Sequence, residues 1–282
     1  MLTVMAHYST LQTQTEAGIH TIIFNRPEKR NALNHQLMED LTHALEAVGQ
    51  STRCRVVILT GAGSAFCAGL DLEHLRAMLS DSSGEASTAR HDAAQQAAHY
   101  QTDAEQVAKL LSTLYCLPKP TIAAVNGPAI AGGMGIATLC DFTLAAPEAK
   151  FGYTEVRIGF IPAIVSAYLR AQIGDKRSRE LLLTGRLIGA MEAERLGLVT
   201  RVVPEPELLR EARALAATLL RNSPAAMEAT KNLLCRFADR HLVNDIQTAI
   251  QSNVSVRTSD DFREGVSAFL EKREPRWPSA KG

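Results

Sequence analysis

Two glycine-rich segments carry the residues whose types and spacing best suggest chemistry. They are "LTGAGSAFCAGLDL" at 59–72 and "VNGPAIAGGMGIA" at 125–137, and each follows a short apolar run. Small residues at such a turn expose backbone N–H groups, and the start of a helix adds partial positive charge. Two such turns facing each other would form an oxyanion hole, in which two amides hold one carbonyl oxygen. Phosphate binding and plain tight turns are the alternatives, although neither segment matches the phosphate-loop or dinucleotide-binding patterns.

The segments around these turns predict a layered α/β core. Short runs rich in apolar residues predict strands at 19–25, 55–61, 121–126 and 142–146. The spacing of leucines predicts a helix over 34–49, with Asn34 as its N-cap. A polar stretch at 79–96 predicts a loop that leads into a helix ending near Tyr115. Beyond about residue 162 the pattern becomes helical, and strands that alternate with helices favour an α/β fold.

Composition excludes several classes of function. The 282 residues include 30 basic and 30 acidic side chains, so no excess charge favours nucleic acid or an anionic membrane. No apolar run reaches the roughly 20 residues that span a bilayer, and the N-terminus lacks the layout of a signal peptide. The five cysteines are odd in number and form no C-x-x-C pair, which predicts free thiols in a reducing compartment. We therefore expect a cytoplasmic protein without membrane or nucleic-acid partners.

Longer stretches match the order and spacing of a known family. They are "NRPEKRNAL" (25–33), "AFCAGLDL" (65–72), "VNGPAIAGGMGIATLCDFTLAAPEAKFGYTEVRIGFIP" (125–162), "LLLTGRLIGAMEAERLGLV" (181–199) and "FREGVSAFLEKR" (262–273). The chain resembles the crotonase superfamily of enoyl-CoA hydratases and isomerases over almost its whole length. The resemblance implies a spiral of ββα units over 1–200, which holds the CoA and active sites, and a helical oligomerisation region over 201–282. It also implies a homo-oligomer, either a trimer or a dimer of trimers. The substrate would be an acyl-CoA thioester, with no cofactor or metal beyond the CoA that the substrate carries.

The resemblance also implies roles for individual residues. The two oxyanion amides would belong to Leu70 and Gly132. Ala131 replaces the first glycine of the family's triplet, and we expect the added methyl group to matter little. The residues expected to bind substrate or its CoA are Lys29, Arg30, Ala32, Leu33, Ala68, Asp71, Leu72, Gly133 and Lys272, the last by reaching a neighbour's CoA.

One carboxylate is present and one is missing. Hydratases of this family that use two glutamates carry the first at the position of Gly135 here and the second at Glu155. Glu155 lies between "FGYT" and "IGFIP", so we expect an apolar wall that raises its pKa and suits proton transfer. The alternative interpretation is a surface acid paired with Arg157.

A single glutamate leaves several reactions open. Hydration of a 2-enoyl-CoA would use Glu155 to take a proton from water and return one to the substrate. Isomerisation of a 3-enoyl-CoA needs only one base and no water. Other thioester-enolate chemistry and a non-catalytic CoA-binding scaffold complete the set. The stretch "TEVRIGFIPAIVS" (154–166) is similar to bacterial methylglutaconyl-CoA-type hydratases, so Arg157 is a candidate for binding a distal substrate carboxylate.

Several other polar residues have simpler interpretations. Cys67 is expected to be a small buried thiol rather than a nucleophile, and Asp71 and Asp141 are expected to cap helices or bind loop amides. Tyr153 and Phe160 are equally consistent with an acyl pocket and with core packing. Three histidines are expected to face solvent without forming a metal site: His35, His43 and His74.

Overall fold

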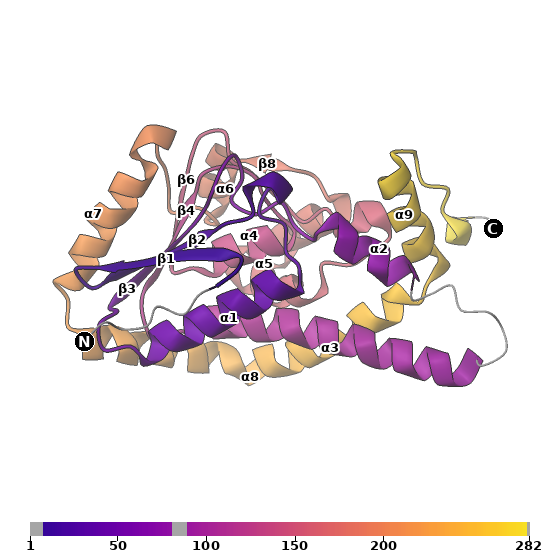
Figure 1. Ribbon diagram of the computed structural model, residues 1–282, viewed down its shortest axis with the longest axis horizontal. Coiled ribbons are helices and arrows are strands. Elements are labelled where there is room, and N and C mark those ends of the chain that lie inside the picture. The colour runs from indigo at the N-terminus through magenta and orange to yellow at the C-terminus, as the bar shows by residue number, and fades with distance from the viewer. Residues whose placement is uncertain (1–7, 81–88, 281–282) are drawn as a thin grey trace.

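The computed structural model describes residues 8–80 and 89–280 (Figure 1). Six strands form a sheet in the order β1-β2-β3-β4-β6-β9, which is parallel except for the β1–β2 pair. The predicted α/β class is therefore confirmed. The strands are β1 (Leu11–Glu16), β2 (Ile19–Phe24), β3 (Val56–Gly61), β4 (Thr121–Val125), β6 (Phe142–Ala145) and β9 (Arg201–Val202).

A second sheet contains three short strands in the order β5-β7-β8. Along the chain, β4 is followed by β5 and a helix, and β6 by β7 and a helix, so each ββα repeat contributes one strand to each sheet. This arrangement matches the expected spiral of ββα units. The strands are β5 (Ala129–Ile130), β7 (Lys150–Gly152) and β8 (Ile188–Gly189). Strands this short carry almost no signal of their own in the sequence.

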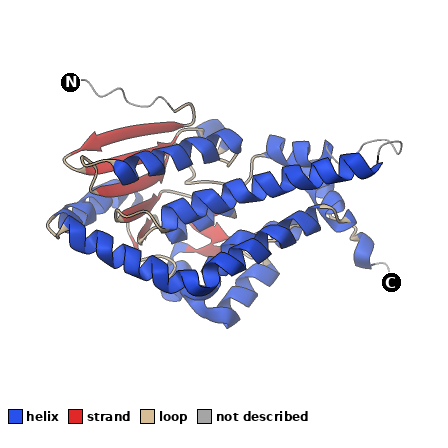
Figure 2. Cartoon of the chain, turned by 90° about the horizontal axis from the view of Figure 1, so that it is seen from below, coloured by secondary structure: helices blue, strands red, loops and turns tan. Residues whose placement is uncertain are grey.

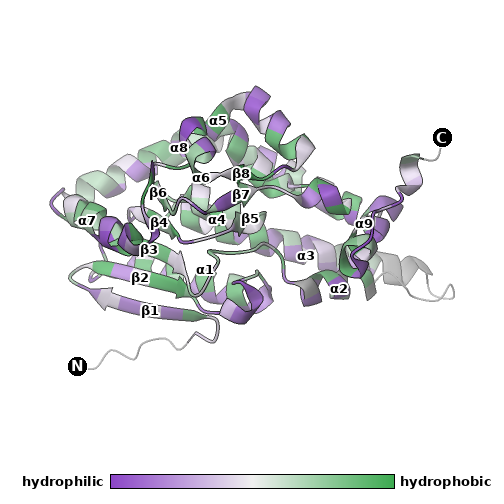
Figure 3. Cartoon of the chain, turned by 90° about the horizontal axis from the view of Figure 1, so that it is seen from above, coloured by the Kyte–Doolittle hydropathy of each residue, from purple (hydrophilic) through white to green (hydrophobic). Residues whose placement is uncertain are grey.

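Helices cover both faces of the larger sheet. Strand β3 is buried on both sides, because Val57 and Leu59 join one apolar cluster while Val56 and Ile58 join another beneath α7. Figure 2 shows the long helices spread over one face of the sheet, and the apolar colouring of the central strands is visible in Figure 3. The helices are α1 (His35–Gln50), α2 (Leu72–Ser80), α3 (Ala89–Tyr115), α4 (Gly132–Leu139), α5 (Ala163–Thr184), α6 (Ala190–Leu196), α7 (Leu208–Leu220), α8 (Pro224–Arg257) and α9 (Asp260–Glu271), with single 3-10 turns η1 (Pro27–Lys29), η2 (Glu155–Ile158), η3 (Glu205–Glu207) and η4 (Pro278–Ala280).

Side-chain caps fix the start of three helices. The Asn34 side chain accepts a hydrogen bond from the Leu37 amide at the start of α1, and Ser223 and Ser259 cap α8 and α9 in the same way. Gly174 breaks the helical geometry inside α5 with φ of 77°. The predicted loop at 79–96 is partly helical, since α3 already begins at residue 89. The rest of that loop, 81–88, lies outside the described residues.

The C-terminal part is not separated from the core in space. β9 pairs with β6, and α7 packs on β3 and β4, although both follow the predicted boundary at residue 200. The long helix α8 runs alongside α3 and α5, as Figure 1 shows for α3. The division into 1–200 and 201–282 stays a prediction about assembly. None of the described helices is long and apolar enough to cross a membrane.

The prediction that all five cysteines are free thiols is wrong for two of them. Cys116, just after α3, and Cys235, on α8, form a disulfide with a Cα–Cα distance of 5.8 Å. The partners are 119 residues apart in sequence and meet because α8 packs along α3, so spacing alone gave no sign of the pair. The remaining cysteines are buried thiols: Cys54, Cys67 and Cys140.

This pairing predicts a thiol count. When the purified chain is denatured without reductant and alkylated, three of its five cysteines should be modified, and all five after reduction. Peptide mass spectrometry identifies the protected pair as Cys116 and Cys235. Alkylation of all five without reductant would restore the expectation from the sequence.

Candidate active site

Three chain segments lie side by side in parallel at the centre of the predicted site. Cys67 forms a bridge with Ala129, and Ala129 in β5 pairs with Phe151 in β7. The chain then continues in the same direction from each segment. Leu70, Gly132 and Glu155 follow three, three and four residues later. The register therefore brings both predicted oxyanion amides and the predicted catalytic carboxyl to one end of the small sheet.

The first turn holds the Leu70 amide in a fixed direction. Leu33 donates its N–H to the Gly69 carbonyl at 2.7 Å, and its carbonyl accepts from the Asp71 amide at 2.9 Å. These two hydrogen bonds form a parallel β-bridge between Leu33 and Leu70. The Leu70 N–H therefore points away from Leu33, toward the side on which Cys67 pairs with Ala129. Gly69 has φ of 95°, which glycine adopts without strain. Among the residues the structure describes, none accepts a hydrogen bond from the Leu70 N–H.

The second turn brings the start of α4 against the first. A Cβ on Gly132 would lie 2.7 Å from the Leu33 side chain, and a Cβ on Gly133 would clash with the Cys67 carbonyl. Both glycines are therefore needed for close contact between the turns. Gly132 is the first residue of α4, where helical N–H groups have no partner in the helix. Its amide donates to no group in the described part of the chain, so it remains free to bind a substrate oxygen.

The alanine in the glycine triplet is not a neutral change. Ala131 has φ of 51° and ψ of −122°, a backbone conformation that residues other than glycine rarely adopt. Its amide donates to the Gly152 carbonyl at 2.8 Å and its carbonyl accepts from Gly135, so the surroundings hold this geometry in place. A strained residue of this kind costs about 1–3 kcal/mol. The methyl group therefore has a cost in stability that the sequence did not reveal, while the Gly132 amide keeps its expected position at the start of α4.

Glu155 is buried without a partner for one of its oxygens. The residue is 8% exposed, and no described group donates a hydrogen bond to Oε2. Burial raises the pKa of Glu155 from 4.5 to about 7. The expected apolar wall is present, since buried Tyr153 and Phe160 flank the turn. The alternative interpretation, a surface acid paired with Arg157, does not hold.

The C-terminal helix α9 fixes the turn that carries Glu155. A Cβ on Gly265 of α9 would clash with Ile158 at the end of η2, and one on Gly159 would clash with Asp261. Phe160 also donates its N–H to the Glu155 carbonyl at 3.0 Å and packs against Phe262 of α9, with ring centroids 5.4 Å apart. Glycines at these two positions therefore let two backbones touch directly.

The position of the missing carboxylate is filled by apolar groups. A Cβ on Gly135 would lie 2.8 Å from Val165 of α5 and 3.8 Å from Leu111 of α3. A glutamate side chain therefore has no room at residue 135 unless these side chains move. Among the residues predicted for catalysis, Glu155 supplies the only titratable side chain.

The predicted CoA-binding turn lies directly beside the oxyanion turns. Ala68 donates its N–H to the Arg30 carbonyl at 3.1 Å, so η1 and the residues after it are tied to the Leu70 segment. Lys29 and Arg30 are exposed, as phosphate-binding residues must be, while Ala32 and Leu33 are buried. Lys29 also forms an ion pair with Glu73 of α2 at 2.9 Å.

Two supporting residues were missed in the sequence. Asn31 is fully buried, and its side chain donates to the carbonyls of Ala62 and Ala65 while accepting from the Arg26 amide. Its position just after a proline turn was a usable signal, because asparagine tolerates a positive φ, which is 55° here. Arg26 is the second of these residues, and its guanidinium forms an ion pair with the Asp71 carboxylate at 2.7 Å.

Some predicted substrate-binding residues lie elsewhere or have other partners. The Asp71 carboxylate pairs with Arg26 and accepts from the Glu73 amide, which confirms its expected role as a helix cap.

Arg157 is exposed and packs near Gly185, so its side chain leaves η2 in a different direction from Glu155. Lys272 ends α9 at the surface. Leu72 begins α2, and its side chain lies outside what the structure describes.

Two expectations about other polar residues have different outcomes. Cys67 is a buried thiol, as predicted, and burial raises its pKa to about 12. The expectation that the histidines form no cluster is wrong for His35 and His74, because α1, α2 and α3 bring both rings to Asp103. This contact joins residues far apart in sequence, so helical spacing could not reveal it. His43 faces solvent as expected.

The raised pKa of Glu155 predicts a pH-dependent effect on stability. The folded chain keeps this proton up to about pH 7, whereas the unfolded chain releases it near pH 4.5, so the free energy of unfolding falls as pH rises between these values. Glu155→Gln removes this penalty. We expect the variant to be more stable than the parent by about 2–3 kcal/mol at pH 8.5, with no gain at pH 4.5.

Urea unfolding at the two pH values measures this difference. Glu148→Gln is the matched control, because Glu148 is exposed and its charge is already in water. An equal effect of Glu155→Gln at both pH values would show that burial does not shift this carboxyl.

Comparisons with known proteins agree with this geometry. The family model described as enoyl-CoA hydratase/isomerase matches residues 14–280. A putative enoyl-CoA hydratase from Thermus thermophilus is 41% identical over 265 residues, covering 94% of this chain and 99% of that protein. The 2,3-dehydroadipyl-CoA hydratase of Escherichia coli is 32% identical over 268 residues, covering 95% and 98%.

The solved structures extend the agreement to the fold. A crystal structure of an enoyl-CoA hydratase/isomerase from Xanthobacter autotrophicus superimposes with a TM-score of 0.83 at 28% identity, covering 96% of this chain and all of that one. The predicted crotonase fold is thus confirmed. The match along nearly the full length shows that the chain belongs to the enoyl-CoA hydratase/isomerase family.

Proposed function

We propose that the chain adds water across the 2,3 double bond of a 2-enoyl-CoA, with Glu155 as the single acid–base residue. The observation that carries this proposal is the buried Glu155 carboxyl, whose Oε2 has no partner among the described residues. It lies at the same end of the small sheet as the two free amides. Hydratase names among the full-length relatives support the reaction class.

The proposed steps need only these groups. Ionised Glu155 takes a proton from water while the water oxygen attacks C3 of the substrate. Electrons move through C2 onto the thioester oxygen, and the amides of Leu70 and Gly132 stabilise the resulting enolate. Protonated Glu155 then gives its proton to C2, which restores the carboxylate and completes the addition. A pKa of about 7 suits a group that must act as base and then as acid at neutral pH.

Isomerisation is the second candidate, and the surroundings of Gly135 favour keeping it. Val165 and Leu111 occupy the space where a second carboxylate would activate water. A lone base can instead remove a proton from C2 of a 3-enoyl-CoA and return it to C4, through the same enolate and without water. Both reactions use Leu70, Gly132 and Glu155, so the choice rests on whether water enters the site.

A carboxylated acyl group is a finer possibility within the hydratase proposal. It is supported by the likeness of 154–166 to methylglutaconyl-CoA-type enzymes and by the name of the relative from Escherichia coli. Arg157 is exposed, whereas Glu155 is buried, and the structure shows no contact between these two side chains.

A homo-oligomer fits the surface of α8. Large apolar side chains are exposed along its first half, including Leu233, Leu234 and Phe237, which is 64% exposed. A contiguous exposed apolar surface is typical of a protein interface. We propose that this face packs against further copies of the chain, in the trimeric or hexameric assembly expected from the family.

An ultraviolet assay of the conjugated thioester tests the proposal. A 2-enoyl-CoA and a 3-enoyl-CoA are run in parallel with the parent, Glu155→Gln and the exposed control Glu148→Gln. We expect absorbance to fall with the 2-enoyl substrate, a rate roughly 10²–10⁴-fold lower for Glu155→Gln, and no change for Glu148→Gln.

The other outcomes each select a different function. A gain of conjugation with the 3-enoyl substrate alone would make the chain an isomerase. Silence with both substrates while CoA thioesters still bind would direct the assay to carboxylated substrates. Silence there as well would establish the non-catalytic scaffold.

A further inference from the structure

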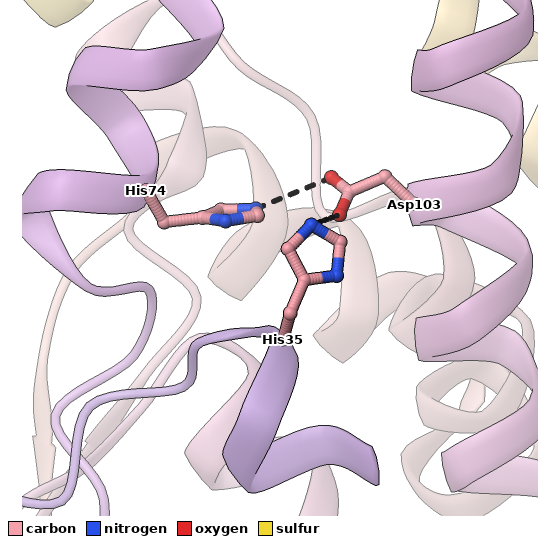
Figure 4. A group of neighbouring side chains, drawn as sticks. All are labelled: His35, His74 and Asp103. Atoms are coloured by element: carbon pink, nitrogen blue, oxygen red, sulfur yellow. Dashed lines mark hydrogen bonds and ion pairs between the residues drawn. The ribbon is translucent and has the colours of Figure 1, made fainter.

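A second polar cluster lies outside the residues proposed for catalysis. His35 begins α1, His74 lies on α2 and Asp103 lies on α3, and Figure 4 shows both imidazole rings directed at the carboxylate. Their ligand atoms all lie within 4.8 Å of one another. The rings meet edge to face with centroids 4.8 Å apart. Side chains from three helices therefore converge on one point.

Hydrogen bonding fixes which nitrogen of His35 carries a proton. Gln106 donates from Nε2 to the His35 carbonyl at 3.2 Å, which orients its amide so that Oε1 lies 2.5 Å from His35 Nδ1. An amide oxygen can only accept, so Nδ1 must be protonated. In neutral His35 the lone pair of Nε2 then faces Oδ1 of Asp103 at 3.3 Å. Two lone pairs in this position need a cation between them, either a proton or a metal ion.

The distances favour a metal ion. His35 Nε2 is 3.3 Å from Asp103 Oδ1, and His74 Nε2 is 3.3 Å from Oδ2. Two ligands of one tetrahedral zinc ion lie about 3.4 Å apart when each is about 2.1 Å from the metal. A charge-assisted hydrogen bond would be shorter, at about 2.8 Å. Oδ1 is also buried and accepts no hydrogen bond from the described residues.

The remaining contacts of Asp103 prepare it to act as a ligand. Arg257 donates to Oδ2 at 2.7 Å and lies between the rings of Tyr100 and Phe160, which leaves Oδ1 unused. The contact of His35 with Gln106 is the kind of outer hydrogen bond that orients a metal-bound imidazole.

We propose that His35, His74 and Asp103 bind a divalent transition-metal ion such as Zn²⁺. Two imidazoles and one carboxylate suit Zn²⁺ and its neighbours better than Mg²⁺ or Ca²⁺, which prefer oxygen ligands alone. The His35 side chain is 48% exposed, so an ion in solution can reach the cluster from this side. The ion would tie α1 and α2 to α3, and these two helices follow Leu33 and Leu70 directly.

Calorimetric titration of ZnCl₂ into the untagged, metal-free protein tests this site. We expect one Zn²⁺ per chain to bind at low micromolar concentration, and affinity to fall at least about tenfold in His35→Ala and in His74→Ala. His43→Ala is the matched control, because His43 is exposed on the same helix α1, and it should bind like the parent. Circular dichroism confirms that each variant is folded.

Two results would overturn the proposal. One is the absence of stoichiometric Zn²⁺ binding by the folded parent protein. Nitrogen NMR that shows both nitrogens of His35 protonated would then assign a proton to the space between His35 Nε2 and Asp103 Oδ1. The other is equal binding by the parent, His35→Ala and His74→Ala, which would place the metal elsewhere. Tetrahedral absorption bands of the Co²⁺ form, lost in His74→Ala, would support the site independently of any activity.

Discussion

The parallel register of Cys67, Ala129 and Phe151 is the constraint on which the site depends. It aligns three segments so that the Leu70 amide, the Gly132 amide and the Glu155 carboxyl follow at one end of the small sheet. The register holds only if α4 can begin against the backbone of Cys67, which requires the bare Cα of Gly133. A shift by one residue would turn the amides away from each other, because neighbouring N–H groups along an extended chain point in opposite directions. The turn at 25–33 then supports the Leu70 segment through the hydrogen bond from Ala68 to Arg30, and helix α9 supports the Glu155 turn through the contact of Gly265 with Ile158.

The site also contains features that oppose folding. Glu155 is buried without a partner for Oε2, and Ala131 adopts a positive φ. Each is unfavourable by itself, and together they remain tolerable because the apolar clusters on both faces of β3 and the hydrogen bonds of Asn31 hold the surroundings rigid. A buried carboxyl with a pKa of about 7 and two amides without internal partners are costly in the unliganded chain. The carboxyl is suited to moving a proton, and the two amides are suited to stabilising an enolate oxygen.

Much of this arrangement could be predicted from the sequence. The α/β class, the main strands and Asn34 as a cap follow from local patterns, and the position of the two glycine turns side by side follows from the family resemblance. The features that were missed depend on contacts between distant residues. The disulfide of Cys116 and Cys235, the Val165 contact at Gly135 and the cluster around Asp103 all arise where helices pack. The strain at Ala131 was underestimated because the sequence gives the added methyl group but not the backbone angle that it must adopt.

A crystal structure of the chain with a slowly reacting enoyl-CoA analogue would show whether the two amides bind the thioester oxygen. We expect this oxygen to accept hydrogen bonds from both Leu70 and Gly132, at about 2.7–3.1 Å from each nitrogen. We also expect C2 and C3 to lie beside the Glu155 carboxyl. A thioester oxygen bound by neither amide, or an acyl chain directed away from Glu155, would contradict the proposed roles of these groups. Such a complex would show that the parallel register serves some purpose other than holding an enolate.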